Sequence, residues 1–347
     1  MKQVVLRGPR DLVIEDAEMD TSHLGPHEIY VETEITALKL GTDRGAWEGV
    51  VSMPGAPMWF PRWLGDSNLG EVRGVGSEVT RFNVGDRVVS RQHHQSAWIA
   101  DEWGAKGAGQ IVKVPERVSS EDAVYTHLYS LSGFCYRKAQ FRPGEYVAVV
   151  GVGVLGLGAI ALGPIYGAQV VAIANSPIRL EMAKKMGAHE GFLSDDPDLQ
   201  EKLDDFSLGN GIDLVILTAN PWPAYRTACE IVRRSGRISV VALSGRGEAD
   251  LDFNPLWSGY FYDKGISLIA ANGEAEDTYP SETDDKRWSH ERRAEHILGL
   301  MEDGRLQPSK LITHRMHYTE TAKAYQLMET RNKNMLGVVF DWTDVEG

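Results

Sequence analysis

Cysteine is scarce in this sequence of 347 residues. The chain has only two cysteines, Cys135 and Cys229, and they lie far apart in sequence. A disulfide framework, or a structural zinc site built from a four-cysteine loop, needs more of them. We therefore expect both thiols to be reduced and buried in the core.

The sequence also has no excess of positive charge and no long apolar run. Its formal net charge is -13, so nucleic acid and anionic membranes would be repelled over most of the surface. No segment approaches the roughly 18 consecutive apolar residues of a membrane span, and the N-terminal segment, with Glu15 and Asp16, has no signal-peptide h-region. We expect a cytoplasmic protein that binds neither nucleic acid nor a membrane and acts on a small-molecule substrate.

What is present is the composition of an ordinary folded protein. Hydrophobic residues make up 42% of the chain and charged residues 24%, which is typical of globular proteins. At about 100–200 residues per domain, the length favours two domains.

The first third of the chain reads as short β-type segments separated by turns, at residues 3–6, 28–32, 70–72 and 85–89. This pattern predicts a β-rich, partly barrel-like domain. Helical periodicity begins near Glu121, with an apolar stripe that ends at Phe134.

From Tyr146 onwards, strand-like and helix-like segments alternate. Such alternation is what a parallel sheet with helical crossovers requires. The expected strands cover residues 147–150, 169–174, 212–217, 237–243 and 266–271.

The C-terminal part has a different pattern. The polar segment 278–291 predicts a surface loop. After it we expect helices over residues 293–301 and 320–329 and a closing strand over 337–340.

A glycine loop connects the apolar strand 146–150 to the apolar segment 157–166. In it, Gly151 suits the tight turn, Gly153 lets the backbone approach a pyrophosphate, and Gly156 lets the helix pack closely on the strand. The amides at the start of the helix, including Val154 and Leu155, then receive the phosphates. This context predicts a dinucleotide site.

The residues after the second strand of this unit indicate which dinucleotide is bound. A site that prefers NAD usually carries a carboxylate there for the ribose hydroxyls, but this chain has Ala174. Asn175, Ser176 and Arg179 follow, and together they suit a 2′-phosphate. The pattern favours NADP over NAD, unless Arg179 is merely a solvated helix residue.

Taken together, the chain resembles the medium-chain dehydrogenase/reductase superfamily, and more closely its polyol-dehydrogenase and bacteriochlorophyllide-dehydrogenase-like branches. The resemblance covers nearly the full length. The segments that carry it are Gly41-Thr42-Asp43, Gly85-Asp86-Arg87-Val88, residues 147–156, Lys184-Lys185-Met186-Gly187-Ala188, Leu311-Ile312-Thr313-His314 and Leu336-Gly337-Val338-Val339.

The resemblance implies a fold of the α/β class, in which a Rossmann doubly wound parallel sheet is inserted in a β-rich GroES-like catalytic domain. The GroES-like domain would comprise residues 1–128 and 274–347, and the Rossmann domain residues 129–273. Residues that follow the Rossmann strands would edge the ribose and nicotinamide. They are Thr218, Ala219, Asn220, Leu243, Ser244, Ala271 and Asn272.

The resemblance also shows where a catalytic zinc would lie in related enzymes. At the family's cysteine position this chain has Leu40, and at the histidine and glutamate positions it has Asp66 and Ser67. Asp66 and His127, which lies roughly at the remaining position, are fewer than the three protein ligands of a catalytic zinc. We therefore expect no metal.

A neighbouring pair, His93 and His94, also resembles a ligand set. Adjacent side chains on a strand point to opposite faces, however. We expect these two to be loop or surface histidines.

A zinc-free site still needs a group that moves a proton while the cofactor moves a hydride. Thr42 matches the position that relays the proton in zinc-dependent relatives. Lys39, Asp43, Asp66 and His127 are further candidates, because each falls in or near the segments that surround the missing metal. Of these we rank Asp66 and His127 first. The alternatives are that Asp43 holds a loop, Lys39 is solvated and His127 packs within its helix.

Trp47, Trp59 and Trp63 are the candidates for substrate contacts. Aromatic walls suit the apolar faces of sugars, polyols and ring compounds, although ordinary core or interface packing is an equal alternative.

These features predict an NADP-dependent, zinc-independent enzyme that interconverts an alcohol, namely a polyol, a sugar-derived or a cyclic hydroxy compound, and its carbonyl form. One alternative is an enoyl or quinone reductase that acts on an activated C=C bond. Another is a nucleotide-binding protein without turnover, with a structural or sensor role. The resemblance further implies a homo-oligomer, a dimer or tetramer built partly along residues 266–271.

Overall fold

A computed structural model describes residues 1–50, 58–104, 110–247, 249–272 and 289–345. It divides the chain into two compact units. The first comprises Met1–Gly49, Pro57–Ser130 and Glu274–Gly347, and the second comprises Val50–Ala56 and Leu131–Gly273. Most of the predicted surface loop, residues 278–288, lies outside the described residues.

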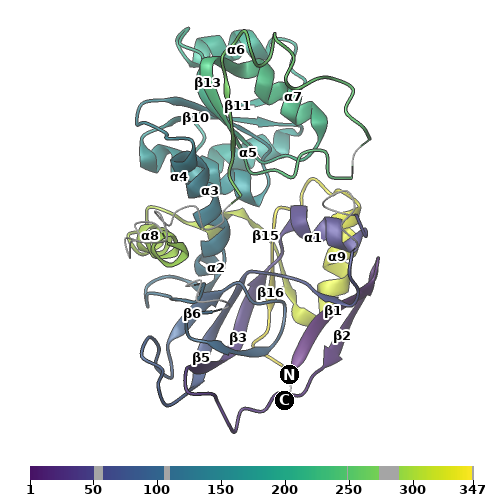
Figure 1. Cartoon of the computed structure of the whole chain (residues 1–347), viewed down its shortest axis with the longest axis vertical. Coiled ribbons are helices and arrows are strands. Elements are labelled where there is room, and N and C mark those ends of the chain that lie inside the picture. Colours follow the sequence, from purple (N-terminus) through teal and green to yellow (C-terminus); the bar gives the residue numbers. More distant parts are fainter. Residues whose placement is uncertain (51–57, 105–109, 248, 273–288, 346–347) are drawn as a thin grey trace. The chain divides into compact units, whose positions relative to one another are not determined.

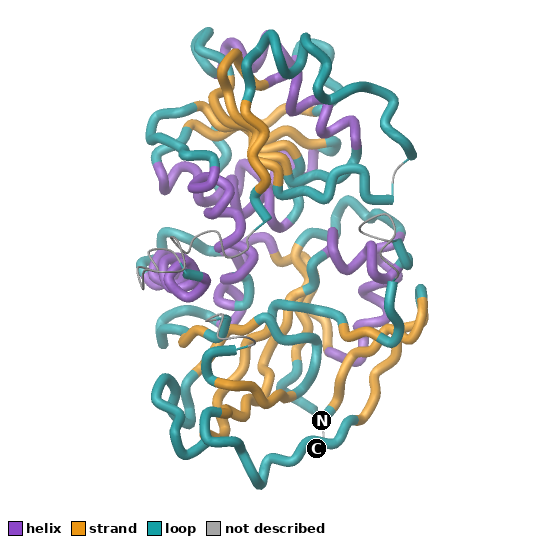
Figure 2. The backbone as a smooth tube through the Cα atoms, viewed as in Figure 1, coloured by secondary structure: helices purple, strands orange, loops and turns teal. Residues whose placement is uncertain are grey.

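The second unit is built on a six-stranded sheet in which every neighbouring pair of strands is parallel (Figures 1 and 2). The strands lie in the order β11-β10-β9-β12-β13-β14. The chain thus builds the sheet outwards from β9, first to one side and then to the other, which is the topology of a doubly wound dinucleotide-binding sheet. The strands are β9 (Tyr146–Val150), β10 (Gln169–Ala174), β11 (Glu190–Leu193), β12 (Ile212–Leu217), β13 (Val232–Val240) and β14 (Ser267–Ala270).

Four helices connect these strands: α4 (Val154–Tyr166), α5 (Pro177–Met186), α6 (Leu199–Phe206) and α7 (Trp222–Ile231). Residues of α6 and α7 share one apolar cluster with β9, β10, β12 and β13. The central strands are buried along nearly their whole length. This burial explains their largely apolar sequences, because parallel strands are covered on both faces.

Several sequence predictions for this unit are confirmed. Strands are present at residues 147–150, 169–174 and 212–217, as expected. The prediction of a strand over 237–243 was wrong at its end, because β13 stops at Val240 and the chain then turns. Both cysteines are free and buried, also as expected.

The first unit is rich in antiparallel β-structure. Its larger sheet runs β15-β16-β3-β5-β6-β8, with β7 also paired to β3, and a smaller sheet runs β2-β1-β4 (Figure 1). The strands are β1 (Lys2–Gly8), β2 (Asp11–Asp16), β3 (Glu28–Ala37), β4 (Arg62–Trp63), β5 (Asn68–Val75), β6 (Arg87–Ser90), β7 (Ala97–Asp101), β8 (Val112–Lys113), β15 (Ile312–His317) and β16 (Gly337–Asp341).

The helices that begin in the first unit are α1 (Leu40–Trp47), α2 (Ser120–Ala123), α3 (Thr126–Lys138), α8 (His290–Glu302) and α9 (Thr321–Glu329). The helical stripe predicted from Glu121 to Phe134 is therefore two helices and not one. The side chain of Ser119 caps α2 by accepting a hydrogen bond from the Asp122 amide. Among the helices of the described residues, none is long and apolar enough to cross a membrane.

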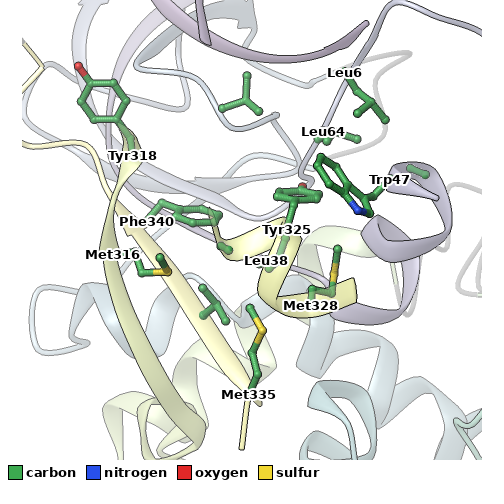
Figure 3. Packing of buried hydrophobic residues seen from close by; sticks show 14 of the residues in the cluster. Leu6, Leu38, Trp47, Leu64, Met316, Tyr318, Tyr325, Met328, Met335 and Phe340 are labelled. Atoms are coloured by element: carbon green, nitrogen blue, oxygen red, sulfur yellow. The ribbon is translucent and has the colours of Figure 1, made fainter. Parts of the chain in front are cut away.

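An apolar cluster joins α1 and α9 to the strands of this unit. Leu6, Leu64, Trp47, Tyr325 and Phe340 are among its buried members (Figure 3). The cluster fixes the helices that carry several of the polar residues described next.

Candidate functional site

The glycine loop of the second unit leads from β9 into α4. Gly151 has a φ of +101°, a conformation that favours glycine. Its carbonyl oxygen accepts a 2.7 Å hydrogen bond from the hydroxyl of Thr218, just after β12. A Cβ atom on Gly156 would lie 1.9 Å from this same oxygen. The helix can begin this close to the strand only because position 156 has no side chain.

Gly153, at the N-cap of α4, is the open position of the loop. A Cβ atom built on it would meet no atom of the described chain within 4 Å. Val154 and Leu155 follow directly, and the first amides of a helix lack an intrahelical acceptor and carry partial positive charge. Open space beside such amides fits a pyrophosphate.

Further polar residues lie where β12, β13 and β14 end. The Asn220 side-chain oxygen accepts a 3.0 Å hydrogen bond from the Leu243 amide, which ties two of these loops together. The Ser244 hydroxyl is buried and has no hydrogen-bond partner in the described part of the chain. Because the carboxyl ends of parallel strands meet at one edge, these residues share that edge with the glycine loop. The predicted cofactor residues placed there are Thr218, Ala219, Asn220, Leu243, Ser244, Ala271 and Asn272.

The end of β10 carries the three residues expected to meet a 2′-phosphate. Asn175 is exposed, and Ser176 is the N-cap of α5. Arg179 is partly buried and donates a 2.6 Å hydrogen bond to the Val152 carbonyl, inside the glycine loop. Burial lowers the pKa of Arg179, and no carboxylate of the described residues pairs with it. Its guanidinium group therefore offers positive charge at the loop, and the description of a freely solvated side chain does not fit it.

A second group of polar residues lies in the first unit, around Asp66. The Lys39 ammonium group donates a hydrogen bond to Asp66 Oδ2, and Arg91 Nη2 lies 3.5 Å from the same oxygen. The other carboxylate oxygen, Oδ1, is buried and has no hydrogen-bond partner among the described residues. Burial acts to raise the pKa of Asp66, but Lys39 and Arg91 outweigh it and hold the pKa below its usual range. Asp66 is therefore an anion at neutral pH.

His127, near the start of α3, belongs to the same group. Its Nε2 atom is buried and has no hydrogen-bond partner within the described chain. Burial, followed by the charge of Arg91, lowers the pKa of His127 to about 3, although Asp66 opposes this shift. The imidazole is therefore neutral at neutral pH. Lys39 and Asp66 form an ion pair, and His127 lies within the electrostatic reach of both.

Asp43 and Thr42 occupy the start of α1 with different surroundings. The buried Asp43 carboxylate accepts a 2.8 Å hydrogen bond from the Lys39 amide. Burial, reinforced by the charge of Asp66, raises the pKa of Asp43 to about 7. Thr42 is exposed and makes no hydrogen bond to another described residue through its hydroxyl. Asp43 thus holds the Lys39 backbone in place. The Thr42 hydroxyl makes no hydrogen bond that links it to the polar residues around Asp66 in the described chain.

The three tryptophans do not form one wall. Trp47 is 3% exposed, packs in the apolar cluster of Figure 3 and donates a 2.9 Å hydrogen bond to Glu329. This burial favours core packing, the alternative to substrate contact, for Trp47. Trp63 donates a 3.0 Å hydrogen bond to Gln3, and Trp59 is 77% exposed.

His93 and His94 lie in a loop, as expected, but His94 is not at the surface. It is fully buried, and its Nδ1 atom lies 2.8 Å from the Thr36 hydroxyl. Its ring also meets Phe340 edge-on, with 5.2 Å between the ring centroids. Burial lowers the pKa of His94 to about 3. It is a neutral core histidine.

Sequence reasoning missed Arg62, whose charge acts on Asp43, and Tyr325, whose pKa is raised in part by Asp43 and Asp66. Arg62 in β4 has a buried Nε atom, and Tyr325 in α9 has a buried hydroxyl, and neither group has a hydrogen-bond partner in the described residues. Tyr325 lies far from Arg62 in the chain. No motif joins the two, so only the fold identifies them.

The residues around Asp66 do not fit a catalytic zinc. Leu40 has no donor atom, and Asp66 already faces two cations, Lys39 and Arg91. Within the described ranges, no group of three or more His, Cys, Asp or Glu side chains is placed to hold a metal. A zinc ion needs three protein ligands and an electrostatic environment that favours a divalent cation.

Comparison with known proteins connects both units to described families. Residues 25–116 match the family described as alcohol dehydrogenase GroES-like domain. Residues 154–281 match the family described as zinc-binding dehydrogenase. The second match begins after Leu40, Asp66 and His127 and so bears on the nucleotide unit alone. Together with the strand topology, these matches confirm the predicted fold class.

Curated relatives and solved structures extend the comparison to nearly the whole chain. Sorbitol dehydrogenase of Halalkalibacterium halodurans is 23% identical over 88% of this chain and 90% of the relative. The NADP-dependent isopropanol dehydrogenase of Thermoanaerobacter brockii is 26% identical over 79% and 82%. The crystal structure of 2R,3R-butanediol dehydrogenase from Bacillus subtilis has a TM-score of 0.79 at 19% identity and covers 98% of this chain and 99% of its own. The last likeness concerns the fold alone.

Proposed function

This chain belongs to the medium-chain dehydrogenase/reductase superfamily of oxidoreductases, and we propose that it interconverts an alcohol and its carbonyl form with NADP and without zinc. The substrate class is a polyol, a sugar-derived or a cyclic hydroxy compound. The observation that carries this proposal is the ion pair between Lys39 and Asp66, with His127 within its electrostatic reach.

The Lys39 ammonium group supplies the positive charge that a carbonyl oxygen needs as it becomes an alkoxide. Asp66 positions this group through its Oδ2 atom. In the reducing direction, a proton moves from Lys39 Nζ to the alkoxide oxygen, and in the oxidising direction it returns. The bound nicotinamide supplies or accepts the hydride.

Asp66 Oδ1 and the neutral His127 Nε2 are the remaining polar atoms of the group without partners in the described chain. Buried polar groups are nearly always hydrogen-bonded. Both atoms are therefore assigned to hydroxyl groups of the substrate. A compound with several hydroxyls satisfies them better than a simple alcohol, which supports the polyol class.

Preference for NADP is supported by Arg179 and by the absence of a carboxylate at Ala174. A guanidinium group held at the glycine loop suits a phosphate dianion. The similarity to an NADP-dependent relative agrees with this assignment.

Absence of zinc from the reaction is supported by the donor set. A divalent cation at Asp66 would have to displace Lys39 and stand beside Arg91. The Lys39 charge is already in place and needs no metal to polarise a carbonyl.

We further propose that the chain forms a homo-oligomer through β14. This strand is the last of the six-stranded sheet in the described residues, and an edge strand offers unpaired backbone groups to a second copy. Sedimentation of the purified protein tests this proposal, and a monomer at micromolar concentration contradicts it.

Cofactor titration combined with metal analysis tests the central proposal. We expect NADP(H) to bind more tightly than NAD(H), and we expect activity on a panel of polyols and ketoses to survive exhaustive chelation. One zinc per chain, with activity lost on its removal, contradicts the zinc-free mechanism.

The same protein is then assayed on enones and quinones. Reduction of these compounds by a protein that is inert towards alcohols and ketones would favour the activity of an enoyl or quinone reductase. Tight nucleotide binding without turnover of either panel would favour a structural or sensor role.

A further inference from the structure

Arg62 is a partly buried arginine without an ion pair in the described residues. It lies in β4, directly across from Leu6 of β1, and paired residues on adjacent strands place their side chains on the same face. Leu6 is fully buried in the apolar cluster. The Arg62 Nε atom is buried and has no acceptor among the described residues. A buried guanidinium N–H without an acceptor is costly, and a bound ligand or ion is one way in which proteins satisfy such a group.

Tyr325 provides a second donor in the same neighbourhood. Its side chain is fully buried and belongs to the same apolar cluster as Leu6 (Figure 3). Its hydroxyl also has no hydrogen-bond partner in the described chain. Burial raises the pKa of Tyr325 well above its usual value, with Asp43 and Asp66 adding to the rise and Arg62 opposing it. The phenol is therefore a neutral donor, and it lies within the electrostatic reach of Arg62 and of both carboxylates.

The charges of this region favour an anion. Lys39, Arg62 and Arg91 are cations, and Asp66 is an ionised carboxylate that faces Lys39 and Arg91. Asp43, with its pKa raised to about 7, is only partly ionised at neutral pH. Local positive charge is unusual in a chain whose net charge is -13. An anionic compound would otherwise be repelled by most of the surface.

From these observations we propose that the substrate carries an oxyanion, a carboxylate or a phosphate, that accepts hydrogen bonds from Arg62 Nε and the Tyr325 hydroxyl. Its reacting carbon is then held at Lys39 and Asp66. This inference rests on the proposed function and narrows the substrate class from neutral polyols to acidic or phosphorylated ones. Arginine is suited to both oxyanions because its planar donors match their geometry.

Binding of three matched probes tests the subsite. D-sorbitol, D-gluconate and D-sorbitol 6-phosphate share a hydroxylated six-carbon chain and differ in charge. Isothermal titration of each probe into the full chain with NADP should give a dissociation constant at least about tenfold lower for one anionic probe than for sorbitol, the scale of one charge-assisted hydrogen bond. A preference for gluconate identifies a carboxylate subsite, and a preference for the phosphate identifies a phosphate subsite.

Two variants assign this preference to the named donors. In Arg62→Met the ratio of sorbitol to anion dissociation constants should fall to near one. In Tyr325→Phe, which removes only the hydroxyl, it should fall about threefold or more, as expected for a neutral hydrogen bond. Tyr325→Phe also covers the case in which Arg62→Met fails to fold. Arg73→Met is the matched control, because Arg73 pairs with Glu32 and Glu71 at the surface of the same unit, and it should retain the wild-type ratio.

The proposal is overturned if no anionic probe binds more tightly than sorbitol, or if the ratio of dissociation constants stays at the wild-type value in Arg62→Met or in Tyr325→Phe. Turnover is measured separately. A chain that binds an anionic probe through Arg62 but oxidises no alcohol has the subsite without the proposed function. A chain that oxidises sorbitol and binds all three probes equally has the function without the subsite.

Discussion

The guanidinium group of Arg179 donates a 2.6 Å hydrogen bond to the carbonyl oxygen of Val152. This bond ties α5 to the glycine loop and fixes a positive charge where β10 ends. We expect Arg179→Met to weaken NADP(H) binding by about 10- to 100-fold, the range of a charge-assisted hydrogen bond. Binding of NAD(H), which lacks the 2′-phosphate, should change much less. Fluorescence titration with both reduced cofactors measures the ratio.

Lys185→Met is the control for this experiment. Lys185 is exposed on the same helix, so its loss removes equal charge without touching the loop. If Arg179→Met weakened the binding of NADP(H) and NAD(H) equally, Arg179 would hold the loop in place and would not contact the 2′-phosphate.

Alanine substitutions at Gly156 and Gly153 should have different effects, the first on stability and the second on dinucleotide binding. A Cβ atom on Gly156 would collide with the Gly151 carbonyl, whereas one on Gly153 would enter open space. We expect Gly156→Ala to lower the free energy of unfolding by about 1–3 kcal/mol, the usual cost of overpacking. Gly153→Ala should change the free energy of unfolding by no more than about 0.5 kcal/mol. It should still weaken dinucleotide binding at least about tenfold, because the methyl group occupies the space of the pyrophosphate. Denaturant unfolding and cofactor titration measure the two quantities, and intact binding in Gly153→Ala would place the pyrophosphate elsewhere.

Lys39 should matter for turnover more than for cofactor binding. In Lys39→Met, we expect kcat to fall by about 100-fold or more, in line with the loss of a general acid, while NADP(H) affinity stays the same. Lys184→Met is a suitable control, because Lys184 pairs with Glu190 at the surface. Steady-state kinetics on the best substrate of the panel provides the measurement. A normal kcat in Lys39→Met would remove Lys39 from the mechanism.

Buried neutral histidine should make the protein sensitive to acid. The pKa of His94 is lowered from 6.5 to about 3, so between these values the unfolded chain binds a proton that the folded chain does not. Its contribution to stability is complete above pH 6.5 and is lost as the pH falls towards 3. For one such group the free energy of unfolding changes by about 1.4 kcal/mol per pH unit.

We therefore expect His94→Gln to flatten the pH dependence of unfolding between pH 4 and 6 relative to the wild type. Because other groups titrate in the same range, the comparison is made between variants, by urea unfolding at each pH. His23→Gln, which changes an exposed side chain, should follow the wild type. Parallel pH profiles for all three proteins would show that His94 is protonated in the fold.

The parallel sheet was predictable because each buried strand is marked by the apolar residues of its own short segment. Residues 147–150 and 214–217 are uninterrupted apolar runs, and burial on both faces demands that pattern. β11 was missed for the same reason, since Glu190 and Gly191 interrupt the run and the strand is only half-buried at the edge. The division between α2 and α3 was also missed, because the apolar stripe continues across it.

The polar group of the first unit was predictable only in part. Resemblance to a family pointed to Lys39, Asp66 and His127, which lie on segments with recognisable motifs. Arg62 and Tyr325 come from β4 and α9, and their burial depends on packing that no local pattern encodes. His94 was misjudged for a similar reason, because a loop residue can be drawn into the core by partners such as Phe340.

Gly151 is held on three sides. Its amide donates a 3.0 Å hydrogen bond to the Ile173 carbonyl. Its carbonyl oxygen accepts a hydrogen bond from the Thr218 hydroxyl, and Gly156 packs against this same carbonyl oxygen. A loop braced in this way has its shape before any nucleotide arrives. Binding then requires little ordering of the backbone, so more of the interaction free energy remains as affinity. Association should follow a single kinetic phase whose rate rises linearly with nucleotide concentration, as for a ligand that enters a rigid receptor.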